Sequence, residues 1–257
     1  MIQRRTTILP YIHIAGFEIS TYLVFAGLGI MTGLLYQVWT MEQAGISSKD
    51  AVVIYSVGTA CCLLGARLMY AAGRIPGAGA GSLWYYLRYG GISFYGGMLG
   101  SVLSVWISSR ILKRDFRRMI DHIILSFPLF HAVARLGCFF SGCCYGIPWD
   151  KGIAMAEMPD VPRVPVQLLE SLCCFLIFAG LLIIDRIRGT EEYNLEIYLV
   201  SYAVCRYFLE FLRGDFSRGI WQDGLSTAQH VSVLILAAVG VSVLSRYRAI
   251  PRGETGK

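Results

Sequence analysis

Charged side chains are scarce in this sequence, and their scarcity excludes an ordinary water-soluble domain. Only 16% of the 257 residues are charged and 55% are hydrophobic, whereas about a quarter of the residues in a typical soluble domain are charged. Several apolar runs reach about 20 residues, the length that a helix needs to cross a bilayer. The sequence therefore predicts an all-α integral membrane protein. In such a protein the net charge of +6 says little about nucleic acid, and no nucleic-acid partner is expected.

Several familiar signatures are also missing. Six of the eight cysteines are direct neighbours, at 61–62, 143–144 and 173–174. Adjacent helical positions point about 100° apart, so these pairs resemble neither a C-x-x-C site nor a disulfide framework. The polar start Met1–Thr7 leads into a full-length span without a small-residue cleavage pattern, so no cleavable signal peptide is expected. Internal repeats and low-complexity tracts are absent, and one domain over residues 1–257 is expected.

Apolar runs of sufficient length predict seven membrane-spanning helices. The predicted spans are approximately Ile19–Trp39, Ala51–Ala72, Ile92–Ser109, Met119–Phe140, Val166–Ile184, Leu195–Leu212 and Leu225–Leu244. An odd number of spans places the two termini on opposite sides of the membrane.

The lysines and arginines outside the spans predict the orientation, because cytoplasmic loops carry the excess of positive charge. One side receives eight: Arg4, Arg5, Arg74, Arg88, Lys151, Arg163, Arg213 and Arg218. The other receives twelve: Lys49, Arg110, Lys113, Arg114, Arg117, Arg118, Arg186, Arg188, Arg246, Arg248, Arg252 and Lys257. The second side is predicted to be cytoplasmic, which places the N-terminus outside and the C-terminus inside.

Two long loops fall on the predicted outer side. The loop at about 73–91 contains Trp84, Tyr85, Tyr86 and Tyr89 and is expected to lie along the membrane interface. The loop at about 141–165 contains four prolines and cannot be a continuous helix.

The stretch from His131 to Gly146 stands out because it places a cation, Arg135, inside an apolar helical run. An intramembrane guanidinium is costly unless it is paired, and its planar fork suits a phosphate group. His131 lies four residues earlier and so shares a helical face with Arg135. The glycines at 137, 142 and 146 allow close backbone approach, which also suits an anion.

Other ionisable residues also fall in the predicted spans, namely Glu18 near an end, Arg67, Glu170, Arg206 and Glu210, with Arg213 directly after the sixth. The spacing of Arg206, Glu210 and Arg213 puts them on one helical face. Each residue alone could belong to a structural ion pair that ties helices together. Arginines on several helices at the same outer depth, however, imply an anionic ligand, most simply a phospholipid head group.

Taken in order, the motifs of this chain resemble those of the prolipoprotein diacylglyceryl transferase family. The resemblance rests on Tyr22, Gly65-Ala-Arg67-Leu-Met-Tyr70, Ser93-Phe-Tyr95-Gly-Gly97-Met-Leu-Gly100, Arg135-Leu-Gly-Cys-Phe-Phe-Ser-Gly142 through Gly146, Pro165-Val-Gln167-Leu-Leu-Glu170, Arg206-Tyr-Phe-Leu-Glu210-Phe-Leu-Arg213 and Ser226-Thr-Ala-Gln229. Each motif alone is weak, whereas the ordered set over most of the chain is specific. The family is also known for seven helices with the N-terminus outside.

The resemblance implies transfer of the diacylglyceryl group of phosphatidylglycerol to the thiol of a lipoprotein-precursor (lipobox) cysteine or a related acceptor, with release of glycerol phosphate. It implies no cofactor and no metal, and a multi-pass protein of the bacterial inner membrane whose site faces the outer side. The catalytic residues that it implies are Tyr95, His131, Arg135, Arg206 and Glu210. The substrate-binding residues are Tyr22, Arg67, Gly96, Gly97, Cys138, Ser141, Gly142, Gly146, Gln167, Glu170 and Arg213.

The chain departs from the family pattern at its proposed base. Tyr95 stands where the family usually has histidine, and Cys138 and Ser141 stand where it usually has asparagine. Either Tyr95 or His131 is then the candidate base. Two other readings stay open: a non-catalytic lipid or small-molecule carrier with the same cationic cavity, and a metal site built from His131, Cys138, Cys143 and Cys144. The cysteines themselves are candidates for packing, for a reversible disulfide or for ligation.

Overall fold

Helices make up most of the computed structural model. It describes residues 8–14, 16–43, 47–73, 82–91, 93–155, 158–188, 193–215 and 218–249. Within these ranges five helical segments are long and apolar enough to cross a membrane: Thr21–Thr40, Ser48–Ala72, Phe116–Ser141, Val166–Ile187 and Thr227–Arg248. The all-α membrane class is thereby confirmed, while the count of seven spans and the orientation remain predictions.

Each of the seven predicted spans overlaps a helix or a helical run. The helices are α1 Thr21–Gln43, α2 Ser48–Ala72, α3 Ser82–Tyr89, α4 Phe94–Ile111, α5 Phe116–Ile123, α6 Phe127–Ser141, α7 Val166–Arg188, α8 Asn194–Leu209 and α9 Thr227–Ala249, with short 3-10 turns η1 Ile124–Ser126 and η2 Glu210–Leu212. The predicted third and sixth spans correspond to α4 and to α8 with η2, which are not among the five apolar segments above.

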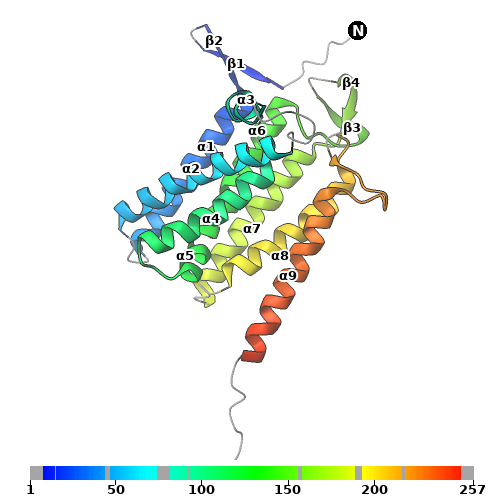
Figure 1. The fold of residues 1–257 in the computed structure, drawn as a ribbon. Helices are drawn as coiled ribbons and strands as arrows, with labels where there is room; N and C mark the ends of the chain where they lie inside the picture. The colour runs from blue at the N-terminus through cyan, green and yellow to red at the C-terminus, as the bar shows by residue number, and fades with distance from the viewer. Residues whose placement is uncertain are drawn as a thin grey trace, which may run out of the picture. The chain divides into compact units, whose positions relative to one another are not determined.

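Two compact units account for the contacts of the chain, one formed by Met1–Gly33 with Ile124–Lys257 and the other by Leu34–Ile123. In the first unit α6 packs against α7, α7 against α8, and α8 against α9 (Figure 1). This order brings the charged residues of α6, α7 and α8 onto neighbouring helices. The expectation of a single domain over residues 1–257 stays a prediction.

The second unit depends on glycines that let α2 and α4 approach closely. A Cβ atom added at Gly65 would collide with the carbonyl oxygen of Gly96, and one added at Gly100 would collide with that of Cys61. Small residues at such a contact allow helix backbones to pack tightly inside a membrane. The packing of α2 on α4 is extensive, so the close approach that these glycines allow forms the core of this unit.

A short antiparallel hairpin of β1 Tyr11–Ile14 and β2 Phe17–Ser20 precedes α1. The first span, predicted from about Ile19, begins at Thr21 instead, because Ile19 pairs with Ile12 in this hairpin. Glu18, predicted near the end of the span, lies in β2 with an exposed side chain, and its Oε1 is 3.6 Å from Nδ1 of His13. The turn at Gly16 has a φ of 84°, which a glycine adopts without strain.

The motif helix α6 ends as its glycine predicts. Gly142 adopts a φ of 77°, and its N–H and that of Cys143 bond back to the carbonyls of Phe139 and Cys138. The chain then forms a second hairpin, β3 Pro148–Met155 and β4 Met158–Arg163, before α7 begins at Val166. The prediction that residues 141–165 are not a continuous helix is confirmed.

Candidate active site

The carboxylate of Glu170 lies at the centre of a buried ion-pair cluster built from three consecutive helices. Its Oε1 is 3.0 Å from Nη2 of Arg135 on α6, and its Oε2 is 3.2 Å from Nη1 of Arg206 on α8. The hydroxyl of Tyr202, one turn before Arg206, donates to Oε1 at 2.9 Å. Because only 2% of the side chain of Glu170 is exposed, both guanidinium groups are held by a carboxylate that water barely reaches.

His131 joins this cluster one turn before Arg135, as the spacing of four residues predicts. Its Nε2 is 3.8 Å from Oε1 of Glu170, and its ring centroid is 5.0 Å from that of Tyr202. The opposite ring nitrogen, Nδ1, is buried and has no hydrogen-bond partner among the described residues. His131 thus has one nitrogen turned toward the cluster and one without a described partner.

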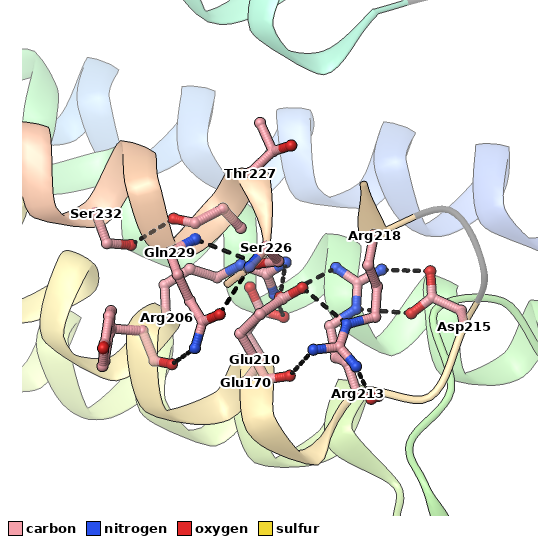
Figure 2. A network of polar contacts seen from close by, with 12 residues as sticks. Glu170, Arg206, Glu210, Arg213, Asp215, Arg218, Ser226, Thr227, Gln229 and Ser232 are labelled. Carbon is pink, nitrogen blue, oxygen red and sulfur yellow. Dashed lines mark hydrogen bonds and ion pairs between the residues drawn. The ribbon is translucent and has the colours of Figure 1, made fainter. Parts of the chain in front are cut away.

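A second carboxylate, Glu210, extends the cluster past the end of α8, as Figure 2 shows. Its Oε2 lies 2.6 Å from Nη2 of Arg206 and 3.8 Å from Nη1 of Arg213, which confirms that these residues share a face. Its Oε1 lies 3.2 Å from Nε of Arg218. Asp215 in turn accepts two hydrogen bonds from Arg213, at 2.8 and 2.6 Å.

Positive charge exceeds negative charge in this network. Among the described residues it joins four arginines, Arg135, Arg206, Arg213 and Arg218, to three carboxylates, Glu170, Glu210 and Asp215, so these groups carry one positive charge in excess with His131 neutral. Buried charges are stable only when they are paired. The excess therefore favours binding of an anion at the cluster.

The two arginines proposed to bind phosphate differ in their surroundings. Arg206 directs its two terminal nitrogens at two different carboxylates. Arg135 faces Glu170 alone among carboxylates, and its Nε has no hydrogen-bond partner among the described residues. Arg135 is thus the guanidinium with a donor left for a ligand.

The loop after α6 is fixed to the end of α8 through its backbone. The N–H of Ile147 donates to Leu212 at 2.9 Å, and that of Gly214 donates to Tyr145 at 3.0 Å. Gly146 sits between these two bonds, and a Cβ there would collide with the carbonyl oxygen of Val164 and lie 2.8 Å from its Cβ. Glycine at position 146 is therefore required by packing, whichever ligand the loop faces.

The sulfurs of Cys138, Cys143 and Cys144 lie within 4.8 Å of one another next to Arg135, and all eight cysteines are free thiols. Nη1 of Arg135 is 3.8 Å from the sulfur of Cys138. Hydrogen bonds from the thiols of Cys138 and Cys143 lower the pKa of Cys144 against the opposing effect of burial, and Arg135 and Arg213 add to this lowering.

Three further predicted ligands lie near this loop. The amide of Gln167 donates to the carbonyl oxygen of Cys143 at 2.6 Å, so Gln167 fixes the position of the loop. The hydroxyl of Ser141 has no hydrogen-bond partner among the described residues. Tyr22 on α1 lies beside the motif helix, since a Cβ at Gly137 would be 3.4 Å from its carbonyl oxygen. These residues surround the same part of the first compact unit.

The remaining predicted site residues belong to the second compact unit. Arg67 donates to the backbone carbonyls of Leu87 at 3.2 Å and Gly90 at 2.8 Å. Gly96 and Gly97 pack against α2. Tyr95 lies in α4, but its side chain is outside the part of the chain that the structure describes.

Three members of the network escaped the sequence analysis: Tyr202, Asp215 and Arg218. Tyr202 had a usable signal, because it precedes Arg206 by four residues and so shares its face. Asp215 and Arg218 lie after the end of the helix, where no periodicity relates them to Glu210. Their positions follow from the path of the chain beyond α8.

The fold and the site together define a helical membrane protein with a buried arginine–carboxylate cluster that suits an anionic, phosphate-bearing ligand. The family model of prolipoprotein diacylglyceryl transferase matches residues 10–245 of the chain. The chain belongs to this family.

Several relatives match over most of their length. A phosphatidylglycerol–prolipoprotein diacylglyceryl transferase of Clostridioides difficile is 30% identical over 225 residues, which cover 85% of this chain and 87% of the relative. A protein of the same name from Clostridium tetani is 27% identical and covers 91% of this chain and 96% of the relative. One from Chlorobaculum tepidum is 33% identical over 62% of this chain and 57% of the relative.

Proposed function

We propose that this protein transfers the diacylglyceryl group of phosphatidylglycerol to the thiol of a lipoprotein-precursor cysteine and releases glycerol phosphate. Membership of the family and the names of its relatives support this activity. The observation that carries it at the level of the site is the pair Arg135 and Arg206, held 3.0 and 3.2 Å from the two oxygens of Glu170 with one positive charge in excess.

The reaction explains why such a cluster is needed. A thiolate attacks a glyceryl carbon, the bond from that carbon to the phosphate oxygen breaks, and negative charge develops on the departing phosphate. Cations fixed in place before the reaction stabilise that charge most effectively. Arg135 receives the phosphate through its planar guanidinium fork, in which Nε has no partner among the described residues. Arg206 adds charge while Glu210 and Glu170 fix its orientation.

A base has to accept the proton of the acceptor thiol, and two residues are candidates. His131 is buried beside Glu170 and has an unpartnered Nδ1 among the described residues. Tyr95 occupies the place of the histidine in the resemblance described above. Geometry supports His131, while position along the chain supports Tyr95.

The remaining residues are proposed to shape the binding site for the lipid. These residues are Tyr22, Arg67, Gly96, Gly97, Cys138, Ser141, Gly142, Gly146, Gln167 and Arg213. For two of them the contacts favour a positioning role, since Gln167 holds the loop at Cys143 and Arg213 binds both Glu210 and Asp215.

The protein is proposed to span the bacterial inner membrane seven times, with the N-terminus outside and the site near the outer face. The five apolar segments support a multi-pass protein. The excess of basic residues in the loops assigned to the cytoplasm supports the orientation. The aromatic side chains of Trp84, Tyr85 and Tyr89 on α3 are exposed, which supports an interfacial place for the loop at about 73–91.

The decisive experiment incubates purified protein with labelled phosphatidylglycerol and a lipobox peptide, Leu-Ala-Gly-Cys. We expect the label to move to the peptide thiol and glycerol phosphate to appear in equal amount. A peptide with serine in place of cysteine is the control and should stay unlabelled. Tight binding of the lipid without any transfer would favour the carrier over the enzyme.

A further inference from the structure

The end of α6 brings three thiols to one point beside the proposed phosphate site. Cys138 lies in the last turn of the helix, and Gly142 reverses the chain with its φ of 77°. The N–H of Cys143 then donates to the carbonyl of Cys138 at 3.2 Å. The side chains of Cys143 and Cys144 therefore lie close to that of Cys138. Cys144 adopts a φ of 57°, a conformation that residues other than glycine rarely adopt.

The spacing of the three sulfurs fits a single soft metal ion. All three lie within 4.8 Å of one another. A zinc–sulfur bond is about 2.3 Å long, so thiolates around one tetrahedral zinc are roughly 3.8 Å apart. The sulfurs would have to approach one another by at most about 1 Å. Thiolate ligands select thiophilic ions such as Zn²⁺ over Mg²⁺ or Ca²⁺.

The number of ligands matters as much as their spacing. Among the described residues, no other cysteine, histidine or acidic side chain joins this group. Three protein ligands leave one position of a tetrahedral zinc ion free, which is the arrangement of catalytic rather than structural sites. Three thiolates around a divalent ion carry one surplus negative charge, and Arg135, 3.8 Å from the sulfur of Cys138, lies beside it.

We propose that Cys138, Cys143 and Cys144 bind one Zn²⁺ ion and that its fourth position takes the thiol of the acceptor. The binding site itself is independent of the proposed function, while the role of the fourth position rests on it. The guanidinium of Arg135 then adjoins both the bound thiol and the departing phosphate. This places the nucleophile and the leaving group of the transfer around one side chain.

The chemistry balances without any change of oxidation state. Binding of Zn²⁺ releases the three thiol protons to solvent, and coordination of the acceptor thiol releases a fourth, which passes to the base, His131 or Tyr95. The bound sulfur donates an electron pair to the glyceryl carbon as the bond to the phosphate oxygen breaks, and that bonding pair leaves with glycerol phosphate. The thioether product is a poorer ligand than a thiolate and leaves the metal.

Metal analysis of the purified, reduced protein tests the site without any activity measurement. We expect one zinc per chain after equilibration with Zn²⁺ and dialysis. Loss of a group that merely supports a ligand already weakens metal binding by about 10- to 100-fold, so Cys138→Ser, Cys143→Ser and Cys144→Ser should each weaken it at least tenfold. Cys205→Ser is the matched control, because Cys205 is a free thiol outside this group.

Thermal unfolding of the same variants without metal shows whether they fold. Zinc far below one per chain in the folded wild-type protein would overturn the site. So would folded serine variants that bind zinc as well as the Cys205→Ser control does.

Cobalt substitution tests the fourth position separately. Co²⁺ bound by thiolates has a charge-transfer absorption that grows with each added sulfur ligand. We expect the absorption to rise when the Leu-Ala-Gly-Cys peptide is added and to stay constant with the serine peptide. No rise with the cysteine peptide would overturn the acceptor role, even if transfer from phosphatidylglycerol is observed. A rise without any transfer would support coordination and contradict only the proposed function.

Discussion

Arg135 differs from the other arginines of the cluster because it combines a single carboxylate partner with a donor that has no described partner. We expect Arg135→Lys to lower the turnover of lipid transfer by about 10²–10³-fold, the usual effect of removing one strong oxyanion contact. Lysine keeps the charge but loses the planar fork that binds two oxygens at once. Steady-state transfer to the lipobox peptide measures this effect.

The matched control for this change is Arg110→Lys. Arg110 is exposed at the end of α4 and stacks on the ring of Trp106 at 5.4 Å. This variant should keep near-normal turnover. Equal turnover of the two variants would show that Arg135 does not bind the phosphate through two hydrogen bonds.

The choice between His131 and Tyr95 as base is also settled at single residues. If His131 is the base, His131→Gln should slow transfer at neutral pH and Tyr95→Phe should have less effect. If the hydroxyl of Tyr95 is the base, Tyr95→Phe should be the damaging change, and the wild-type rate should rise toward pH 10, near the ordinary pKa of tyrosine of about 10. The pH profiles of the three proteins distinguish these outcomes. Normal activity of both variants would mean that the thiol is ionised by another group.

Some contacts of the site can be predicted from the sequence alone, whereas others cannot. The spacing of four residues predicted the pairing of Arg206 with Glu210, observed at 2.6 Å, and the shared face of His131 and Arg135. Helical periodicity determines such contacts locally. The position of Glu170 between Arg135 and Arg206 was less accessible, because it depends on how three helices pack.

At the level of the elements, the loop after α6 depends on Gly146. A Cβ at this position would meet the backbone and side chain of Val164, neither of which can move freely. We expect Gly146→Ala to destabilise the protein by about 1–3 kcal/mol, the usual cost of overpacking, and to lower its melting temperature in detergent.

Gly240→Ala is the control for this prediction. Nothing lies within 4 Å of a Cβ at Gly240 in the interior of α9. There alanine should raise stability by about 0.5–1 kcal/mol, because glycine is a poor helix residue. Equal melting temperatures of the two variants would contradict the packing argument.

The ends of the elements were harder to predict than their existence. The last span was expected to begin at Leu225, whereas α9 begins at Thr227. The reason is a reciprocal cap. The backbone N–H of Ser226 donates to Oε1 of Gln229 at 2.9 Å, and the backbone N–H of Gln229 donates to the hydroxyl oxygen of Ser226 at 3.3 Å. The hairpin before α1 was not predicted, because its last residues are apolar and look like the start of the span. The hairpin before α7 lies in the stretch 141–165, for which the prolines predicted only that it is not a continuous helix.

At the level of the whole molecule, the predicted orientation can be tested directly. A reporter fused after Lys257 should behave as cytoplasmic. A cysteine introduced by Trp84→Cys, whose native side chain is 71% exposed, should react with an impermeant thiol reagent in intact cells more than the unmodified protein does. Lys113→Cys is the control for the opposite side and should react only after lysis. Exchange of these two patterns would reverse the orientation.

Glu170 lies between Arg135 and Arg206 in the sequence as well as in the structure. The order of synthesis therefore affects how the helices insert into the membrane. The ribosome delivers α6, with its arginine, before the carboxylate that neutralises it. An arginine within a membrane helix costs up to about 2.5–3.5 kcal/mol on insertion scales, the value at the helix centre. Nascent chains that end just before Val166 should therefore retain α6 in the bilayer poorly, and elongation through α7 should rescue its insertion. The central carboxylate would then act as an assembly signal during biogenesis, well before any substrate arrives.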